Sequence, residues 1–102
     1  MRVLVFFDLP VETARQRKKY RKFKKFLIDE GFVMLQESVY SKLAISDRIA
    51  QSIINKLVTN RPSEGLVQAL KVTEKQYANM IYITGDGSEI NTLHSVDEFV
   101  IL

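Results

Sequence analysis

The chain has 102 residues, 46% hydrophobic and 26% charged, a globular composition that argues against disorder and predicts a single domain over residues 1–102. It has no cysteine, which excludes disulfides and thiolate metal sites, and no apolar stretch near the roughly 20 residues of a membrane span. Since no signal-peptide pattern opens the chain either, we expect a soluble, cytoplasmic protein.

The net charge of +3 conceals an uneven distribution along the chain. Eight Lys or Arg residues and no acidic residue lie within residues 15–25, whereas the rest of the chain holds seven basic and twelve acidic residues. One short segment is thus strongly cationic inside an otherwise acidic protein. This asymmetry is the first indication of a polyanionic partner.

The first predicted element is a strand at residues 2–7. This continuous apolar run, rich in β-branched and aromatic side chains, is typical of a central strand buried on both faces. Pro10 stops the strand, and Asp8 lies at its end on the same face as Leu4 and Phe6, because side chains alternate along a strand. Asp8 is consistent with a turn-forming or capping residue and equally with a magnesium ligand.

A second copy of the chain would strengthen magnesium binding at Asp8. Magnesium prefers hard oxygen ligands and often takes only one or two protein carboxylates together with phosphate oxygens. A symmetric dimer would supply two Asp8 carboxylates if this residue lies near the twofold axis, and the metal there could activate water against a phosphodiester. Asp8 is therefore the candidate catalytic residue and the candidate ligand of one Mg²⁺ ion shared at the axis.

A helix is predicted to follow, starting at a capping box formed by Thr13 and Gln16 and running to about Glu30, where Gly31 ends it. One narrow arc of the helix is apolar and packs on the sheet: Tyr20, Phe23 and Leu27. The remaining surface carries the eight cations Arg15, Arg17, Lys18, Lys19, Arg21, Lys22, Lys24 and Lys25.

Two interpretations of the cationic helix are possible, a solvated face or a nucleic-acid-binding surface. Solvated helix faces usually mix signs, whereas four pairs here place like charges four residues apart: Arg15–Lys19, Arg17–Arg21, Lys18–Lys22 and Arg21–Lys25. Each pair costs roughly 0.2–0.5 kcal/mol, and a polyanion along the helix would relieve the repulsion. Contacts with phosphates position a duplex without reading its sequence, so we expect sequence-independent binding. The first candidates are the contiguous ridge Arg15, Lys18, Lys19 and Lys22.

The middle of the chain predicts two strands and a second helix. Residues 32–43 are extended, with a tight bend at 36–38. Ser46 or Asp47 caps the helix, which Asn60 and Pro62 close. The buried stripe of this helix has three- and four-residue spacing and consists of Ile49, Ile53, Ile54, Leu57 and Val58.

Further strands are predicted at 65–72 and 80–84, followed by a turn at 85–87 and a short last strand at 99–102. The order of elements predicts an α+β fold, a ferredoxin-like βαββαβ sandwich with an appended C-terminal strand and both helices on one face of an antiparallel sheet. Because the first strand is apolar on both sides, the other face of the sheet needs a cover. A second copy of the chain is the simplest one, so we expect a homodimer.

Three segments together resemble one known family. A strand ending in FFDLP, the basic helix and the segment GFVMLQESVYSK are similar to CRISPR-associated protein two, the small partner of the CRISPR spacer integrase. The later stretch GLVQALKVTEKQYANMIYITG is similar to the fourth strand, turn and fifth strand of that family, so the resemblance covers essentially the whole chain. The basic helix and the absence of cysteine suggest the branch that accompanies Cas9-type (type II) systems.

The resemblance implies a ferredoxin-like homodimer whose C-terminal strand crosses onto the partner's sheet. It also implies that the strand-end aspartate of the family falls on Asp8, as a magnesium ligand near the dimer axis. Members are described as metal-dependent endoribonucleases or endodeoxyribonucleases. In the adaptation complex the dimer bridges two integrase dimers and holds the middle of a protospacer duplex.

The C-terminal segment, about residues 97–102, is the candidate docking element. It is apolar and β-prone, and the residues that would dock are Phe99, Val100, Ile101 and Leu102. They could add to a sheet edge of the other subunit or of the integrase, or form a strand within their own fold.

Three functions are compatible with these observations. The first is a CRISPR adaptation (spacer acquisition) subunit that dimerises, binds duplex DNA without sequence specificity and bridges integrase dimers. The second is a magnesium-dependent endonuclease acting on RNA or DNA through Asp8 of each subunit. The third is a ferredoxin-like module that binds a small molecule, a function that does not explain the cationic helix.

Overall fold

The computed structural model describes residues 1–85. Its elements are β1 (Arg2–Asp8), α1 (Ala14–Asp29), β2 (Val33–Gln36), β3 (Val39–Leu43), α2 (Asp47–Thr59), β4 (Leu66–Val72) and α3 (Glu74–Ala78). The predicted C-terminal strand, its four docking residues and most of the turn at 85–87 lie outside the described residues. Among the helices of residues 1–85, none combines the length and the apolarity needed to cross a membrane.

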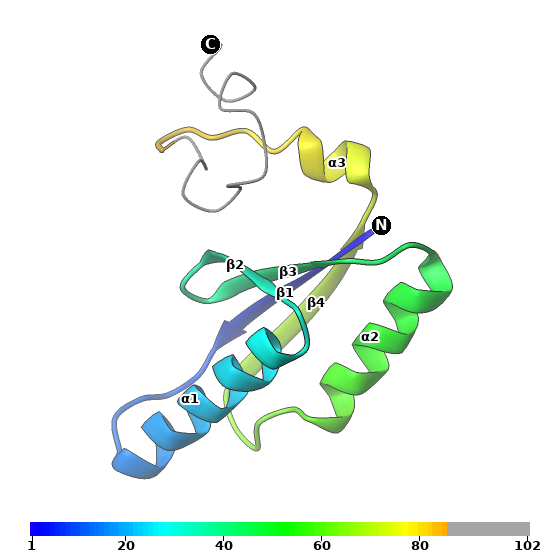
Figure 1. The fold of residues 1–102 in the computed structure, drawn as a ribbon. Helices are drawn as coiled ribbons and strands as arrows, with labels where there is room; N and C mark the ends of the chain where they lie inside the picture. The colour runs from blue at the N-terminus through cyan, green and yellow to red at the C-terminus, as the bar shows by residue number, and fades with distance from the viewer. Residues whose placement is uncertain (86–102) are drawn as a thin grey trace.

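The four strands form one antiparallel sheet in the order β2-β3-β1-β4. The apolar β1 is thus a central strand, as its sequence predicts, and it pairs with β4 along its whole length. Helices α1 and α2 lie together on one side of this sheet (Figure 1). The α+β architecture and the ferredoxin-like order of elements are confirmed.

The core lies between β1 and the two long helices. Val3 and Val5 are fully buried on the side of β1 that faces these helices. The Phe7 ring meets the Phe23 ring edge-on at 5.3 Å and stacks on the Tyr40 ring at 5.7 Å. Burial raises the pKa of the Tyr40 hydroxyl. These aromatic contacts hold α1 against the sheet and leave its opposite side in solvent.

Side-chain caps define where both long helices begin. The backbone N–H of Gln16 donates to Thr13 Oγ1 at 3.1 Å, and the backbone N–H of Thr13 donates to Gln16 Oε1 at 3.0 Å, which confirms the capping box of α1. The N-cap of α2 is Ser46, whose hydroxyl accepts from the backbone N–H of Ile49 at 3.2 Å. Gly31 follows α1 with a φ of 92°, a conformation that favours glycine.

The strand predicted at 80–84 is wrong for the chain as described. Residues 80–84 pair with no strand among residues 1–85, and the side chains of Ile81 and Ile83 are 83% and 93% exposed. An apolar segment becomes a strand only beside a free sheet edge that can receive its hydrogen bonds. Just before this segment the chain forms the short helix α3, which begins at a second capping box, Thr73 with Gln76.

Helix α3 is fastened to the face of the sheet that α1 and α2 leave open (Figure 1). The Arg2 guanidinium lies 4.3 Å from the centre of the Tyr77 ring and donates to the Glu74 carboxylate at 3.0 Å. The Tyr77 hydroxyl lies 3.4 Å from Ser41 Oγ, and Ser41 is 1% exposed. Arg2 and Ser41 lie on the helix-free side of the sheet, so α3 covers part of that side.

Candidate nucleic-acid interface

Helix α1 separates a buried apolar side from a cationic outer side. Phe23 and Leu27 are 3% and 0% exposed, and they fix the helix on the sheet. The acidic residue of the helix, Asp29, lies in its last turn. Four of the eight predicted cations make no hydrogen bond or ion pair with any described residue: Arg15, Lys18, Arg21 and Lys22. These four, here called the free cations, are available to an external anion.

Two other cations of α1 interact with neutral groups. One guanidinium nitrogen of Arg17 donates to the carbonyls of Val11 and Glu12 at 3.1 and 3.0 Å. The Lys24 ammonium lies 5.3 Å from the centre of the Tyr20 ring, within the range of a cation–π contact. Arg17 therefore holds the loop before α1 in place, and neither Arg17 nor Lys24 is paired with a carboxylate of the described residues.

The remaining two cations are paired with acidic residues. Lys25 lies 2.7 Å from the Asp29 carboxylate one turn along the helix. Lys19 donates to Ser63 Oγ at 2.7 Å and lies 3.8 Å from the Glu64 carboxylate. The predicted ridge of Arg15, Lys18, Lys19 and Lys22 thus contains three free cations, and its fourth member joins α1 to the loop between α2 and β4.

Asp8 lies at the end of β1, and its carboxylate is exposed. This carboxylate makes no hydrogen bond or ion pair with the described residues, so it takes no part in the capping of α1, which Thr13 and Gln16 provide. An exposed, unpartnered carboxylate is suited to a hard cation that keeps most of its waters. Residues 1–85 contain no group of three acidic, His or Cys side chains that could hold a metal ion.

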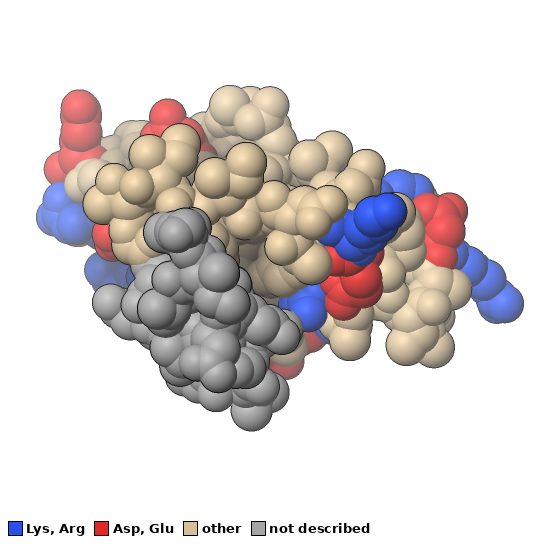
Figure 2. Space-filling view, turned by 90° about the horizontal axis from the view of Figure 1, so that it is seen from above, with Lys and Arg blue, Asp and Glu red and all other residues tan. Residues whose placement is uncertain are grey.

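Asp8 also borders a half-exposed apolar face of the sheet. Leu66 is the register partner of Asp8, and Leu70 is the partner of Leu4, so these side chains share the helix-free face. Leu66 and Leu70 are 54% and 51% exposed. Seen from above in Figure 2, uncharged side chains make up much of the visible surface, with charged ones at both ends and a further group of both signs near the middle.

The loop between α2 and β4 packs against the same end of β1, a feature that the sequence analysis missed. Gly65 has a φ of 90°, and a Cβ atom there would lie 2.7 Å from Leu9 Cδ2 and 2.8 Å from the Asp8 carbonyl oxygen. Only glycine avoids both the strain and the clash. The loop therefore stays close to Asp8 and α1. Its Asn60, Pro62 and Ser63 were not predicted as site residues, because only the fold brings them beside the basic helix.

Comparison with known proteins agrees with the sequence resemblance. The family model described as CRISPR associated protein Cas2 matches residues 1–80. Over 86 residues the chain is 50% identical to the CRISPR-associated endoribonuclease Cas2 of Streptococcus mutans serotype c (strain ATCC 700610 / UA159), covering 84% of this chain and 79% of that protein. It is 49% identical over 102 residues to the protein of the same name from Treponema denticola, and 39% identical to that of Lacticaseibacillus rhamnosus, with both chains fully covered each time. The chain therefore belongs to the CRISPR associated protein Cas2 family.

Proposed function

We propose that this protein is a CRISPR adaptation subunit that binds duplex DNA without sequence specificity through the outer side of α1. The single observation that carries the proposal is the set of free cations, Arg15, Lys18, Arg21 and Lys22, which have no partner among the described residues. Helix α1 has 16 residues and is therefore about 24 Å long, enough to follow several phosphates of a duplex. Lysine and arginine bind phosphates whatever the base sequence.

In this proposal the protein acts as a homodimer in the cytoplasm. The half-exposed apolar face around Leu66 and Leu70 supports dimerisation, since a second copy would remove these side chains from water. A twofold dimer presents two equal surfaces, as a bridge between two integrase dimers requires. Segment 97–102, with Phe99 to Leu102, is the proposed docking element for the partner subunit or the integrase.

The salt dependence of DNA binding tests this proposal. Each phosphate contact contributes about −0.9 to the slope of log affinity against log salt concentration. Four contacts from each of two subunits therefore give a slope of about −7. Fluorescence anisotropy with labelled duplexes of several unrelated sequences would measure it, with the oligomeric state taken from analytical ultracentrifugation. A slope near zero, or an affinity that differs strongly among the sequences, would contradict the proposal.

A second candidate function, magnesium-dependent cleavage of RNA or DNA, is favoured by the exposed and unpartnered carboxylate of Asp8. The name of the relatives, CRISPR-associated endoribonuclease Cas2, supports the same activity. Two Asp8 side chains at a dimer axis, together with phosphate oxygens, would hold one Mg²⁺ ion. Magnesium bound there would supply an activated water for attack on the phosphodiester.

Substitution of the carboxylate tests the second candidate. Asp8→Asn retains the shape of the side chain but removes its charge, so we expect cleavage to be lost and magnesium binding, measured by calorimetry, to weaken. Glu12→Gln is the matched control, because Glu12 is also an exposed acidic residue near the end of β1. Cleavage that persists in Asp8→Asn would exclude this site.

A further inference from the structure

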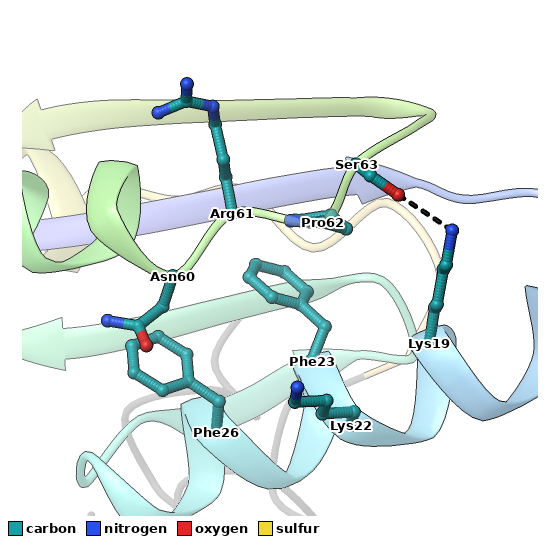
Figure 3. Close-up of a pocket in the computed structure, with 8 residues that line it drawn as sticks. All are labelled: Lys19, Lys22, Phe23, Phe26, Asn60, Arg61, Pro62 and Ser63. Carbon is teal, nitrogen blue, oxygen red and sulfur yellow. Dashed lines mark hydrogen bonds between the residues drawn. The ribbon is translucent and has the colours of Figure 1, made fainter.

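One cation of α1, Lys19, is held by residues from a distant part of the chain. Its ammonium donates to Ser63 Oγ at 2.7 Å, the bond drawn as a dashed line in Figure 3, and lies 3.8 Å from the Glu64 carboxylate. Ser63 and Glu64 belong to the loop that joins α2 to β4. The other carboxylate of residues 1–85 that pairs with a cation of α1 is Asp29, which lies in α1 itself. Among the described residues, Glu64 alone brings negative charge to this surface from another element.

Lys19 occupies a central place on the cationic surface. Residues three and four apart in a helix are neighbours on the same side of it. Lys19 follows Arg15 by four residues and precedes Lys22 by three, so it lies between two of the free cations. A phosphate backbone that runs along Arg15 and Lys22 therefore passes the Lys19 ammonium, and there it also meets the carboxylate of Glu64.

The backbone around Glu64 is held close to α1 from both sides. The next residue, Gly65, packs so tightly on the end of β1 that a Cβ atom there would lie 2.8 Å from the Asp8 carbonyl oxygen. The preceding residue, Ser63, is hydrogen-bonded to Lys19. Because neither neighbour is free to move away, the carboxylate of Glu64 stays beside α1 and acts on any anion that approaches Lys19.

The ion pair of Lys19 with Glu64 is weak enough to be exchanged. At 3.8 Å it is longer than the 2.7 Å pair of Lys25 with Asp29, and its two side chains are 39% and 45% exposed. Such exposed pairs stabilise a protein little, because water screens them and both side chains lose freedom. A contact with a DNA phosphate gains in addition from the release of counterions. The phosphate is thus the stronger partner for Lys19, but it has to displace Glu64, whose carboxylate then repels it.

We propose that Glu64 limits the affinity of the protein for duplex DNA by competing with a phosphate for Lys19. The inference rests on the proposed DNA binding by α1 and names the residue that restrains it. Without the charge of Glu64, Lys19 retains a neutral partner, the hydroxyl of Ser63, and joins the four free cations. Glu64 thus makes the binding weaker and less dependent on salt than the cations of α1 alone would make it.

Replacement of Glu64 by a neutral side chain of the same shape tests the proposal. Glu64→Gln should bind a duplex more tightly at low salt, by about fivefold for each subunit, the factor that one contact between unit charges provides in water. The slope of log affinity against log salt concentration should steepen from about −7 to about −9, since each of two subunits gains one phosphate contact. Fluorescence anisotropy on the full chain with a labelled blunt duplex would measure both quantities.

Glu12→Gln is the matched control for the change in net charge. Glu12 is an exposed acidic residue just before α1, and its side chain makes no ion pair with the described residues. Its substitution removes the same charge without releasing a cation, so it should raise the affinity less than Glu64→Gln and leave the slope at the wild-type value. An equal steepening of the slope in both variants would overturn the proposal.

A double-mutant cycle isolates the competition for Lys19 from direct repulsion of DNA by Glu64. In a Lys19→Gln background, Glu64→Gln should raise the affinity no more than Glu12→Gln does, because the cation that it would release is absent. The same gain from Glu64→Gln with and without Lys19 would contradict the proposal, since Glu64 would then act on the DNA and not through the lysine.

The possible outcomes separate this inference from the proposed function. A wild type that binds duplexes with a steep slope, together with a Glu64→Gln variant of the same affinity and slope, would overturn the inference and leave DNA binding by α1 intact. Absence of duplex binding by both proteins would overturn the proposed function and the inference with it. Binding that appears only in Glu64→Gln and is lost again in the double variant with Lys19→Gln would support the inference and overturn the function proposed for the wild type.

Discussion

Helices α1 and α2 pack side by side on the same face of the sheet, yet they arrange their charges in opposite ways. Helix α2 has Asp47 in its first turn and Lys56 in its last, the arrangement that its dipole favours. Helix α1 has no acidic residue in its first turn and no basic residue in its last, where Asp29 lies instead. The charges at the ends of α1 therefore do not stabilise its helix dipole, whereas those of α2 do.

The outer sides of the two helices differ in the same sense. On α2, Asp47 lies 3.1 Å from Lys71, and Lys56 lies 2.9 Å from Glu30. On α1, four cations have no such partner among the described residues. Helix α2 thus pairs Asp47 and Lys56 within residues 1–85 and leaves one cation, Arg48, without a partner there, whereas α1 leaves four and is suited to an anion from outside.

The largest expected effect on stability comes from the buried sides of the two helices, a feature that α1 and α2 share. Leu27 of α1 and Leu57 of α2 are 0% and 6% exposed, so Leu27→Ala and Leu57→Ala should each lower the free energy of unfolding by about 2–5 kcal/mol. Chemical denaturation followed by circular dichroism would measure both. A loss below about 1 kcal/mol for Leu27→Ala would mean that α1 contributes less to the core than its burial indicates.

Charge reversal should lower the affinity for duplex DNA when it is made on the outer side of α1 but not when it is made on α2. The triple variant Arg15→Glu, Lys18→Glu, Lys22→Glu should weaken duplex binding by at least about 100-fold, because each lost cation–phosphate contact contributes about 1 kcal/mol in water and each new carboxylate repels the phosphates. The α2 double variant Arg48→Glu, Lys56→Glu is the control and should change affinity little. Comparable losses in anisotropy titrations of both variants would show that the whole surface, and not α1, binds DNA.

Removal of the N-cap side chain should lower the stability of the protein for both helices, although the two helices differ in charge. Thr13→Ala and Ser46→Ala each leave early backbone N–H groups without their side-chain acceptor, at a cost of about 1 kcal/mol in unfolding free energy. Thr13→Ala should be the more harmful, since Gln16 also takes part in the capping box of α1. Urea denaturation would measure the difference, and a neutral Thr13→Ala would contradict the role of this box.

The smallest effects should differ in sign. Arg21→Gln removes two like-charge pairs, with Arg17 and Lys25, and should raise the stability of the protein by a few tenths of a kcal/mol. Lys56→Gln removes the exposed ion pair with Glu30 and should lower it by no more than about 1 kcal/mol. Denaturation at low salt would resolve the two, and in about 1 M salt both effects should shrink. Destabilisation by Arg21→Gln would mean that α1 carries no unfavourable repulsion.

Much of the fold follows from local patterns in the sequence. The apolar run of β1, the apolar spacing of α2 and the capping box at the start of α1 act over a few residues, so sequence reasoning placed these elements close to their observed bounds. The predicted buried stripe of α2 was wrong in part, because Ile49 and Val58 are 40% and 52% exposed, whereas Ala50, which was not predicted, is fully buried. The eight cations of α1 were also recognised, because their density is a property of one segment. The helix α3 was missed although Thr73 and Gln76 repeat the capping box of α1.

Other features depend on residues that are far apart along the chain. The predicted strand at 80–84 has the right apolar pattern, but a strand also has to pair with a sheet edge, and residues 80–84 pair with neither of the two edge strands, β2 and β4. Lys19 belongs to the cationic segment, yet its hydrogen bond to Ser63, 44 residues away, sets it apart from the free cations. No local pattern indicates either outcome.

Local composition accounts for the identity of the helices and strands and for the charge of α1, since propensity, periodicity and capping act within one or two turns. Tertiary structure alone decides which cations stay free, why residue 65 has to be glycine beside Leu9, and how Phe26 comes to lie beside Asn60 in Figure 3. The physical reason is that these features are contacts between distant segments, and such contacts exist only after the sheet and both helices have packed.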